Sequence, residues 1–141
     1  MNEKYVTNSS QETQRLGENF AKSLSLGDFV AFYGNLGSGK TTFIQGLAKG
    51  LGITRRIISP TFIIARHYEI KNGSFYHVDL YRMESKRDFL SIGLDQIIDD
   101  KTNIIALEWA EKMGEMLPKK RIEVRCEYLE KDKRRISIKK W

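Results

Sequence analysis

Residues 34–41 of this chain read Gly34-Asn35-Leu36-Gly37-Ser38-Gly39-Lys40-Thr41, and this stretch decides its fold. It matches every position of the pattern G-x-x-x-x-G-K-S/T, the phosphate-binding P-loop. Glycines allow backbone angles and close approaches that a Cβ would block, so the loop can turn its N–H groups toward phosphate oxygens. The Lys40 ammonium suits the β- and γ-phosphates of a nucleotide, and the Thr41 hydroxyl suits Mg²⁺.

The segments on either side of the loop have the character that a P-loop requires. The continuous apolar run 29–33 predicts a strand that is covered on both faces. After the loop, apolar residues recur at helical spacing and glycines follow them, which predicts a helix whose free N–H groups point at the phosphates. These apolar residues are Phe43, Ile44, Leu47, Ala48 and Leu51.

The remaining segments predict a mixed α/β fold. A capping-box pattern at 9–12 and a four-residue apolar repeat indicate a helix over roughly 10–25. The pair Asn72-Gly73 favours a tight turn between strands at 62–70 and 74–80. We further expect a helical stretch at 84–98 interrupted at Gly93, a buried strand at 103–107, and an antiparallel hairpin over 122–128 and 136–138. The predicted fold is a P-loop NTPase fold: a mixed, mostly parallel sheet flanked by helices, with antiparallel hairpin additions.

Length and composition indicate one globular domain over residues 1–141. Hydrophobic residues make up 40% and charged residues 30%, which excludes a disordered chain. No apolar run approaches the roughly 20 residues that cross a bilayer, and the N-terminus lacks a signal-peptide pattern. We therefore expect a cytoplasmic protein without membrane contact. The single cysteine, Cys126, allows no internal disulfide and lies at an apolar strand position, so we interpret it as core packing.

A P-loop site needs a further acidic group for the metal and the attacking water. Two residues qualify, because Asp79 and Glu108 each follow an apolar strand, at the sheet edge where ligands bind. Either carboxylate alone has a structural alternative as a cap or an ion pair. We interpret His77 as a hydrogen-bonded packing residue rather than a catalytic one, and Trp109 as packing near the metal site or as a surface for a partner.

Several nucleotide-dependent classes are excluded or disfavoured by missing motifs. The chain has neither the Asn-Lys-x-Asp stretch nor the D-x-x-G switch of guanine-specific GTPases. A small-molecule kinase usually carries an arginine-rich lid, whereas residues 81–90 contain only Arg82 and Arg87. We therefore expect ATP, with hydrolysis driving a conformational step in a partner. A small-molecule kinase and a non-hydrolysing nucleotide sensor stay as alternatives.

The net charge of +6 lies entirely in the C-terminal part. Residues 118–141 hold ten Lys or Arg and four Asp or Glu, and the preceding residues hold fourteen of each. Such an excess attracts nucleic acid or an acidic protein surface, and it also fits a solvated hairpin with a charged outer face.

Four motifs together resemble one family. They are the P-loop with Thr42, Ser59-Pro60-Thr61-Phe62, His77-Val78-Asp79-Leu80-Tyr81-Arg82, and Leu107-Glu108-Trp109. In this order and spacing the chain resembles the TsaE (YjeE) family of bacterial tRNA threonylcarbamoyladenosine biosynthesis. The resemblance implies a weak ATPase that needs Mg²⁺ and acts with the TsaB–TsaD complex, which modifies adenosine 37 of tRNAs reading ANN codons. tRNA would be contacted indirectly, through the complex.

The resemblance also implies roles for individual residues. Thr41 and Glu108 correspond to Mg²⁺ ligands, and Lys40 and Asp79 to residues tied to hydrolysis, together with Glu108. Ser59-Pro60-Thr61 corresponds to a switch-like segment, and Phe62 replaces a frequent tyrosine. The implied nucleotide contacts are Ser10, Thr13, Gly34, Asn35, Leu36, Gly37, Ser38, Gly39, Lys40, Thr41, Thr42 and Arg135.

Overall fold

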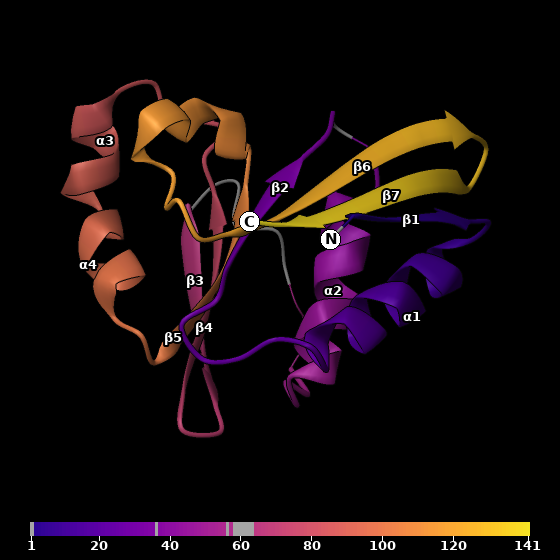
Figure 1. Ribbon diagram of the computed structural model, residues 1–141, viewed down its shortest axis with the longest axis horizontal. Helices are drawn as coiled ribbons and strands as arrows, with labels where there is room; N and C mark the ends of the chain where they lie inside the picture. The colour runs from indigo at the N-terminus through magenta and orange to yellow at the C-terminus, as the bar shows by residue number, and fades with distance from the viewer. Residues whose placement is uncertain (1, 36, 56, 58–63) are drawn as a thin grey trace.

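The computed structural model describes residues 2–35, 37–55, 57 and 64–141. Its strands form a single seven-stranded sheet in the order β1-β7-β6-β2-β5-β4-β3 (Figure 1). The strands are β1 (Asn2–Thr7), β2 (Phe29–Tyr33), β3 (Ala65–Ile70), β4 (Gly73–Asp79), β5 (Asn103–Glu108), β6 (Ile122–Glu130) and β7 (Lys133–Lys140). The helices are α1 (Ser10–Ala21), α2 (Lys40–Gly50), α3 (Lys86–Ser91), α4 (Leu94–Asp99) and the 3₁₀ segment η1 (Ala110–Met116).

The centre of the sheet is parallel and its two sides are antiparallel. The pairs β6–β2, β2–β5 and β5–β4 are parallel, whereas β3 joins β4, and β7 joins β6, in antiparallel hairpins. The mixed α/β prediction is thus confirmed. Both predicted hairpins are present, and Asn72 has φ 65° at the turn between β3 and β4, as the Asn-Gly pair indicated.

Two apolar layers cover the two faces of this sheet. Because side chains alternate along a strand, Val30 and Phe32 of β2 face α1 and α2, while Phe29 and Ala31 face the layer that contains α3, α4 and η1. Figure 1 shows the two groups of helices on opposite sides of the central strands. Burial on both faces explains why β2 and β5 read as continuous apolar runs, as predicted.

Helices α1 and α2 approach each other closely because glycines lie at their contact. A Cβ added at Gly46 would lie 1.9 Å from the carbonyl oxygen of Gln14, and one at Gly17 would lie 2.2 Å from that of Phe43. Ser9 caps α1 by accepting a hydrogen bond from the Glu12 N–H at 3.1 Å. The Glu12 carboxylate accepts from the N–H of Asn8 and not from the cap residue, so the capping box is formed only in part.

One expectation about the elements needs correction, and two elements were not predicted. Helix α1 ends at Ala21 and not near residue 25. Strand β1 was not predicted, because its residues 2–6 are exposed and carry no apolar alternation; it is held by pairing with β7. The 3₁₀ segment η1 was also missed, since it has no regular apolar period. None of the described helices is long and apolar enough to span a bilayer.

Candidate functional site

The P-loop and both candidate acids lie at one edge of the sheet. In the parallel register Phe32 of β2 is paired with Glu108 of β5, and Glu108 is paired with Asp79 of β4. All three strands therefore end side by side. Tyr33, the last residue of β2, pairs with Arg125 of β6, and the P-loop begins at the next residue, Gly34. Ligands of open α/β sheets bind at this carboxyl edge.

The P-loop backbone adopts angles that favour glycine. Gly34, Gly37 and Gly39 have φ of 142°, 76° and 101°. A Cβ at Gly34 would also lie 2.4 Å from the carbonyl oxygen of Cys126 and 2.7 Å from Oγ of Ser38. A side chain at Gly34 therefore conflicts both with the backbone angle and with the packing of the loop against β6.

Lys40 begins helix α2 and its side chain is buried. Its ammonium donates a hydrogen bond to the carbonyl oxygen of Gly34 and lies 4.0 Å from the centre of the Trp109 ring. Trp109 directly follows β5 and has a left-handed backbone with φ 60°, which turns the chain at the edge where Glu108 ends the strand. The ring thus packs against the P-loop lysine and against Tyr81, with ring centres 5.2 Å apart.

The two carboxylates are both buried, and each has a distinct set of contacts. Oδ1 of Asp79 accepts a hydrogen bond from the backbone N–H of Tyr81 at 2.9 Å. Oε2 of Glu108 lies 2.6 Å from Nε2 of His77, which comes from β4 and is fully buried. This hydrogen bond between the imidazole and the carboxylate orients Glu108.

The interpretation of His77 as a hydrogen-bonded packing residue is confirmed, but its partner was missed. His77 is two residues before Asp79, so its side chain lies on the same face of β4, and the register sets it opposite Ala106 in β5. Glu108 is two residues after Ala106 and turns its carboxylate back to the imidazole. Only strand pairing brings these two residues together; the motif order alone did not indicate it.

The chemistry of these residues fits a nucleotide phosphate and a hard cation. Oγ of Ser38 is buried and has no hydrogen-bond partner in the described structure, so it can serve a ligand oxygen. The described residues contain no group of three or more His, Cys, Asp or Glu side chains that could hold a metal ion. Mg²⁺ fits such a site, because it commonly takes one or two protein oxygens and completes its shell with phosphate oxygens and water.

Four of the other predicted residues are described, and they differ in burial. Thr41 and Thr42 are half-buried in the first turn of α2. Ser10 is exposed, and Thr13 is buried with its hydroxyl 2.7 Å from that of Thr7. Leu36 and the segment Ser59-Pro60-Thr61-Phe62 lie outside the described residues.

Neighbouring arginines of β7 point to opposite faces of the strand. Arg135 is exposed, and its guanidinium lies 3.3 Å from the Glu127 carboxylate. A Cβ added at Gly39 would lie 3.5 Å from Cγ of Arg134, so Arg134 is the arginine beside the P-loop. The sequence pattern did not distinguish these two, because hairpin register decides which one faces the site.

The fold and this edge define a P-loop protein of the α/β class. The chain belongs to the TsaE family: the family model described as "Threonylcarbamoyl adenosine biosynthesis protein TsaE" matches residues 7–136. The resemblance found in the four sequence motifs is thereby confirmed.

Individual relatives and a solved structure agree with this family. The tRNA threonylcarbamoyladenosine biosynthesis protein TsaE of Bacillus subtilis (strain 168) is 37% identical over 135 residues, or 96% of this chain and 84% of the relative. That of Borreliella burgdorferi is 42% identical over 108 residues, or 74% of this chain and 78% of the relative. The crystal structure of Bacillus subtilis YdiB matches with a TM-score of 0.83 and 33% identity, covering 98% of this chain and 84% of that one.

Proposed function

We propose that this protein binds ATP with Mg²⁺ at the P-loop edge and hydrolyses it slowly, in support of threonylcarbamoyl modification of adenosine 37 in tRNAs that read ANN codons. Its partners would be TsaB and TsaD, and its place the cytoplasm. One observation carries the proposal. The P-loop, the buried Lys40 and the buried acids Asp79 and Glu108 lie on adjacent parallel strand ends of a TsaE-family chain.

The residues of this site can divide the work of phosphoryl transfer to water. Lys40 lies at the start of α2, where its ammonium and the free helical N–H groups attract phosphate oxygens. Thr41 and Glu108 would hold Mg²⁺, which would offset the negative charge of the phosphates when bound. Asp79 would orient the attacking water, since its Oδ1 is already fixed by the N–H of Tyr81.

A slow reaction in the isolated protein is part of the proposal. Phosphoryl transfer is catalysed mainly by positioning and charge stabilisation, and an arginine supplied by a partner raises the rate about 10³–10⁵-fold in some P-loop proteins. Arg82 follows Asp79 in its motif, and its side chain is exposed. A partner could therefore complete the site or reposition Arg82.

The test is phosphate release from ATP by the purified protein with Mg²⁺, alone and with TsaB and TsaD. We expect slow release alone and a strong increase with both partners. Lys40→Ala should abolish release, while the control Lys49→Ala, an exposed position on the same helix, should leave it unchanged. Bound ATP without any release under either condition would instead support a nucleotide sensor. A phosphorylated small molecule that appears with a candidate acceptor would support a kinase.

A further inference from the structure

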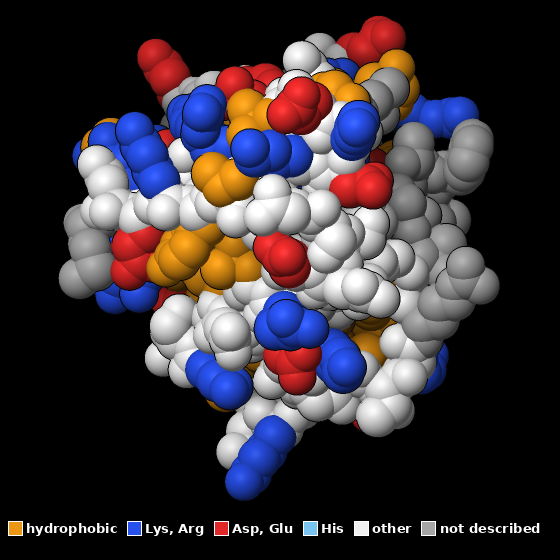
Figure 2. Space-filling view, turned by 90° about the vertical axis from the view of Figure 1, so that its right-hand side faces the viewer, with side chains coloured by type: hydrophobic (Ala, Val, Ile, Leu, Met, Phe, Trp, Pro, Cys, Tyr) orange, Lys and Arg blue, Asp and Glu red, His pale blue; other side chains and the backbone are white. Residues whose placement is uncertain are grey.

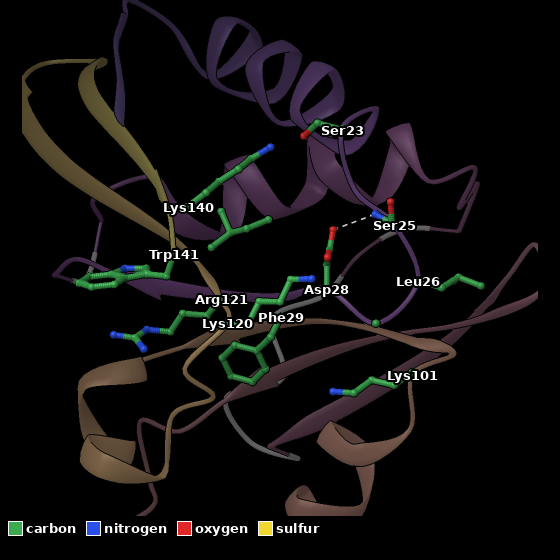
Figure 3. A pocket seen from close by; sticks show the side chains of 12 residues that line it. Ser23, Ser25, Leu26, Asp28, Phe29, Lys101, Lys120, Arg121, Lys140 and Trp141 are labelled. Carbon is green, nitrogen blue, oxygen red and sulfur yellow. Dashed lines mark hydrogen bonds between the residues drawn. The ribbon is translucent and has the colours of Figure 1, made fainter. Parts of the chain in front are cut away.

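A cavity lies at the opposite edge of the sheet from the P-loop. It has a volume of about 450 Å³ and opens where β2 and β6 begin and where β7 ends. Figure 3 shows the side chains that line it, which come from the 23–29 segment, from Lys101 before β5 and from both ends of the β6–β7 hairpin. This volume is within the range of sites that bind a nucleotide-sized ligand.

The cavity has an excess of positive charge that the protein does not neutralise. Its lining contains Lys101, Lys120, Arg121 and Lys140 but only one acid, Asp28. Arg121 is bound to Glu123, with Nε 2.8 Å from the carboxylate, whereas none of the three lysines forms an ion pair within the described part of the chain. Three exposed, unpaired ammonium groups around one hollow attract an anion with more than one charge.

Charge is distributed differently on the face at the far end of the β6–β7 hairpin. Figure 2 shows that face, where Asp and Glu side chains lie among the Lys and Arg side chains. One example is Arg135, which is paired with Glu127. Residues 118–141, which hold the excess positive charge of the chain, contribute Lys120, Arg121 and Lys140 to the cavity.

An aromatic ring lies at the rim of the cavity. Trp141 is 55% exposed, and its backbone N–H donates to the carbonyl oxygen of Arg121 at 2.9 Å, which continues the hairpin pairing. The Arg121 guanidinium lies 4.9 Å and the Lys139 ammonium 4.0 Å from the ring centre. An exposed ring in a basic surround is the combination that binds the bases and phosphates of flexible nucleic acid.

We propose that this cavity is an RNA-binding site: Lys101, Lys120 and Lys140 contact backbone phosphates, and Trp141 stacks on an unpaired base. The exposed ring favours RNA over an acidic peptide, because a peptide carboxylate needs no stacking surface. The choice of tRNA as the natural RNA rests on the proposed function. Since the cavity and the P-loop lie at opposite edges, RNA and ATP can be bound at the same time.

The first experiment measures binding of an unmodified tRNA transcript to the full-length protein over a series of salt concentrations. We expect Lys101→Gln/Lys120→Gln/Lys140→Gln to weaken binding at least about tenfold and to reduce the salt slope by roughly two. The matched control is Lys4→Gln/Lys49→Gln/Lys86→Gln, which removes the same charge from exposed positions outside the cavity. Equal loss in both variants, or no loss in either, would overturn the proposal.

A second experiment uses tryptophan fluorescence to test whether a base stacks on Trp141. The chain has two tryptophans, so Trp109→Phe leaves Trp141 as the only indole. We expect RNA to quench its fluorescence, and poly-glutamate at equal charge not to do so. Quenching by poly-glutamate but not by RNA would replace the RNA site with a site for an acidic protein segment.

ATP binding separates this proposal from the proposed function. The lysine variant should bind ATP like the wild type, and Lys40→Ala should still bind RNA. If the wild-type protein binds RNA normally but neither binds ATP nor releases phosphate, the proposed ATPase function is wrong and the RNA site is unaffected. Loss of RNA binding in Lys40→Ala would show that the RNA occupies the P-loop edge and would overturn the cavity site.

Discussion

Nε2 of His77 lies 2.6 Å from Oε2 of Glu108, and both side chains are almost completely removed from solvent. The imidazole comes from β4 and the carboxylate from the adjacent strand β5, one residue before the chain turns at Trp109. A buried carboxylate needs hydrogen-bond donors, and His77 supplies one to Oε2 of Glu108. The pair therefore fixes where the Glu108 carboxylate stands at the P-loop edge.

Removing the imidazole should weaken the metal site without removing the nucleotide site. We expect His77→Ala to raise the Mg²⁺ concentration needed for half-maximal phosphate release by about 10–100-fold, because partners that orient a metal ligand typically contribute this much. The control is His67→Ala, since His67 is exposed and contacts Ser74 and Tyr76 far from Glu108. An unchanged Mg²⁺ requirement in His77→Ala would show that Glu108 needs no orienting partner.

The contact between Lys40 and Trp109 predicts an optical signal for nucleotide binding. The Lys40 ammonium lies 4.0 Å from the ring centre. A phosphate that attracts this ammonium changes the field at the indole, so we expect Trp109 emission to change when ATP is added. The measurement is made in Trp141→Phe, where Trp109 is the only indole. The change should vanish in Lys40→Ala; its persistence there would separate the ring from the P-loop lysine.

The contact of α1 with α2 predicts a large loss of stability from one methyl group. A Cβ at Gly46 would lie 1.9 Å from the carbonyl oxygen of Gln14, a backbone atom that cannot move alone. We expect Gly46→Ala to reduce the free energy of unfolding in urea by about 3 kcal/mol, despite the better helix propensity of alanine. Lys49→Ala on the same helix is exposed and should change it by less than about 0.5 kcal/mol. Similar stabilities for the two variants would contradict the close helix contact.

Cys126 predicts how stability changes at high pH. Burial raises the pKa of its thiol from 9.0 to about 12. Because the thiol has the higher pKa in the folded state, its protonated form favours folding. Its contribution to the free energy of unfolding is complete below pH 9 and is lost as the pH rises toward about 12. As the pH rises from about 8 to about 10.5, the thiol should lower the free energy of unfolding by about 2 kcal/mol. Cys126→Ala should lack that component when the two urea series are compared; parallel pH profiles would argue against it.

The elements that the sequence predicted well carry their own local signals. Strand β2 is apolar at every position, the Asn72-Gly73 turn needs positive φ, and the helical stretch breaks at Gly93, which has φ 72°. Strand β1 has no such signal: residues 2–6 are exposed, and it exists because β7 offers a free edge. The segment Ser59-Pro60-Thr61 stays a prediction, as do the nucleotide contacts of Ser10, Thr13 and Arg135.

By itself the sequence determined that this chain carries a P-loop between a buried strand and a helix, with two acids at strand ends, since these features depend on residue type and spacing. Only the tertiary structure decided that His77 holds Glu108, that Arg134 and not Arg135 faces Gly39, and that Lys101, Lys120 and Lys140 surround one cavity. The reason is physical. Strand order and register bring together side chains that are far apart in the chain, and no local pattern of residues encodes which strands will be neighbours.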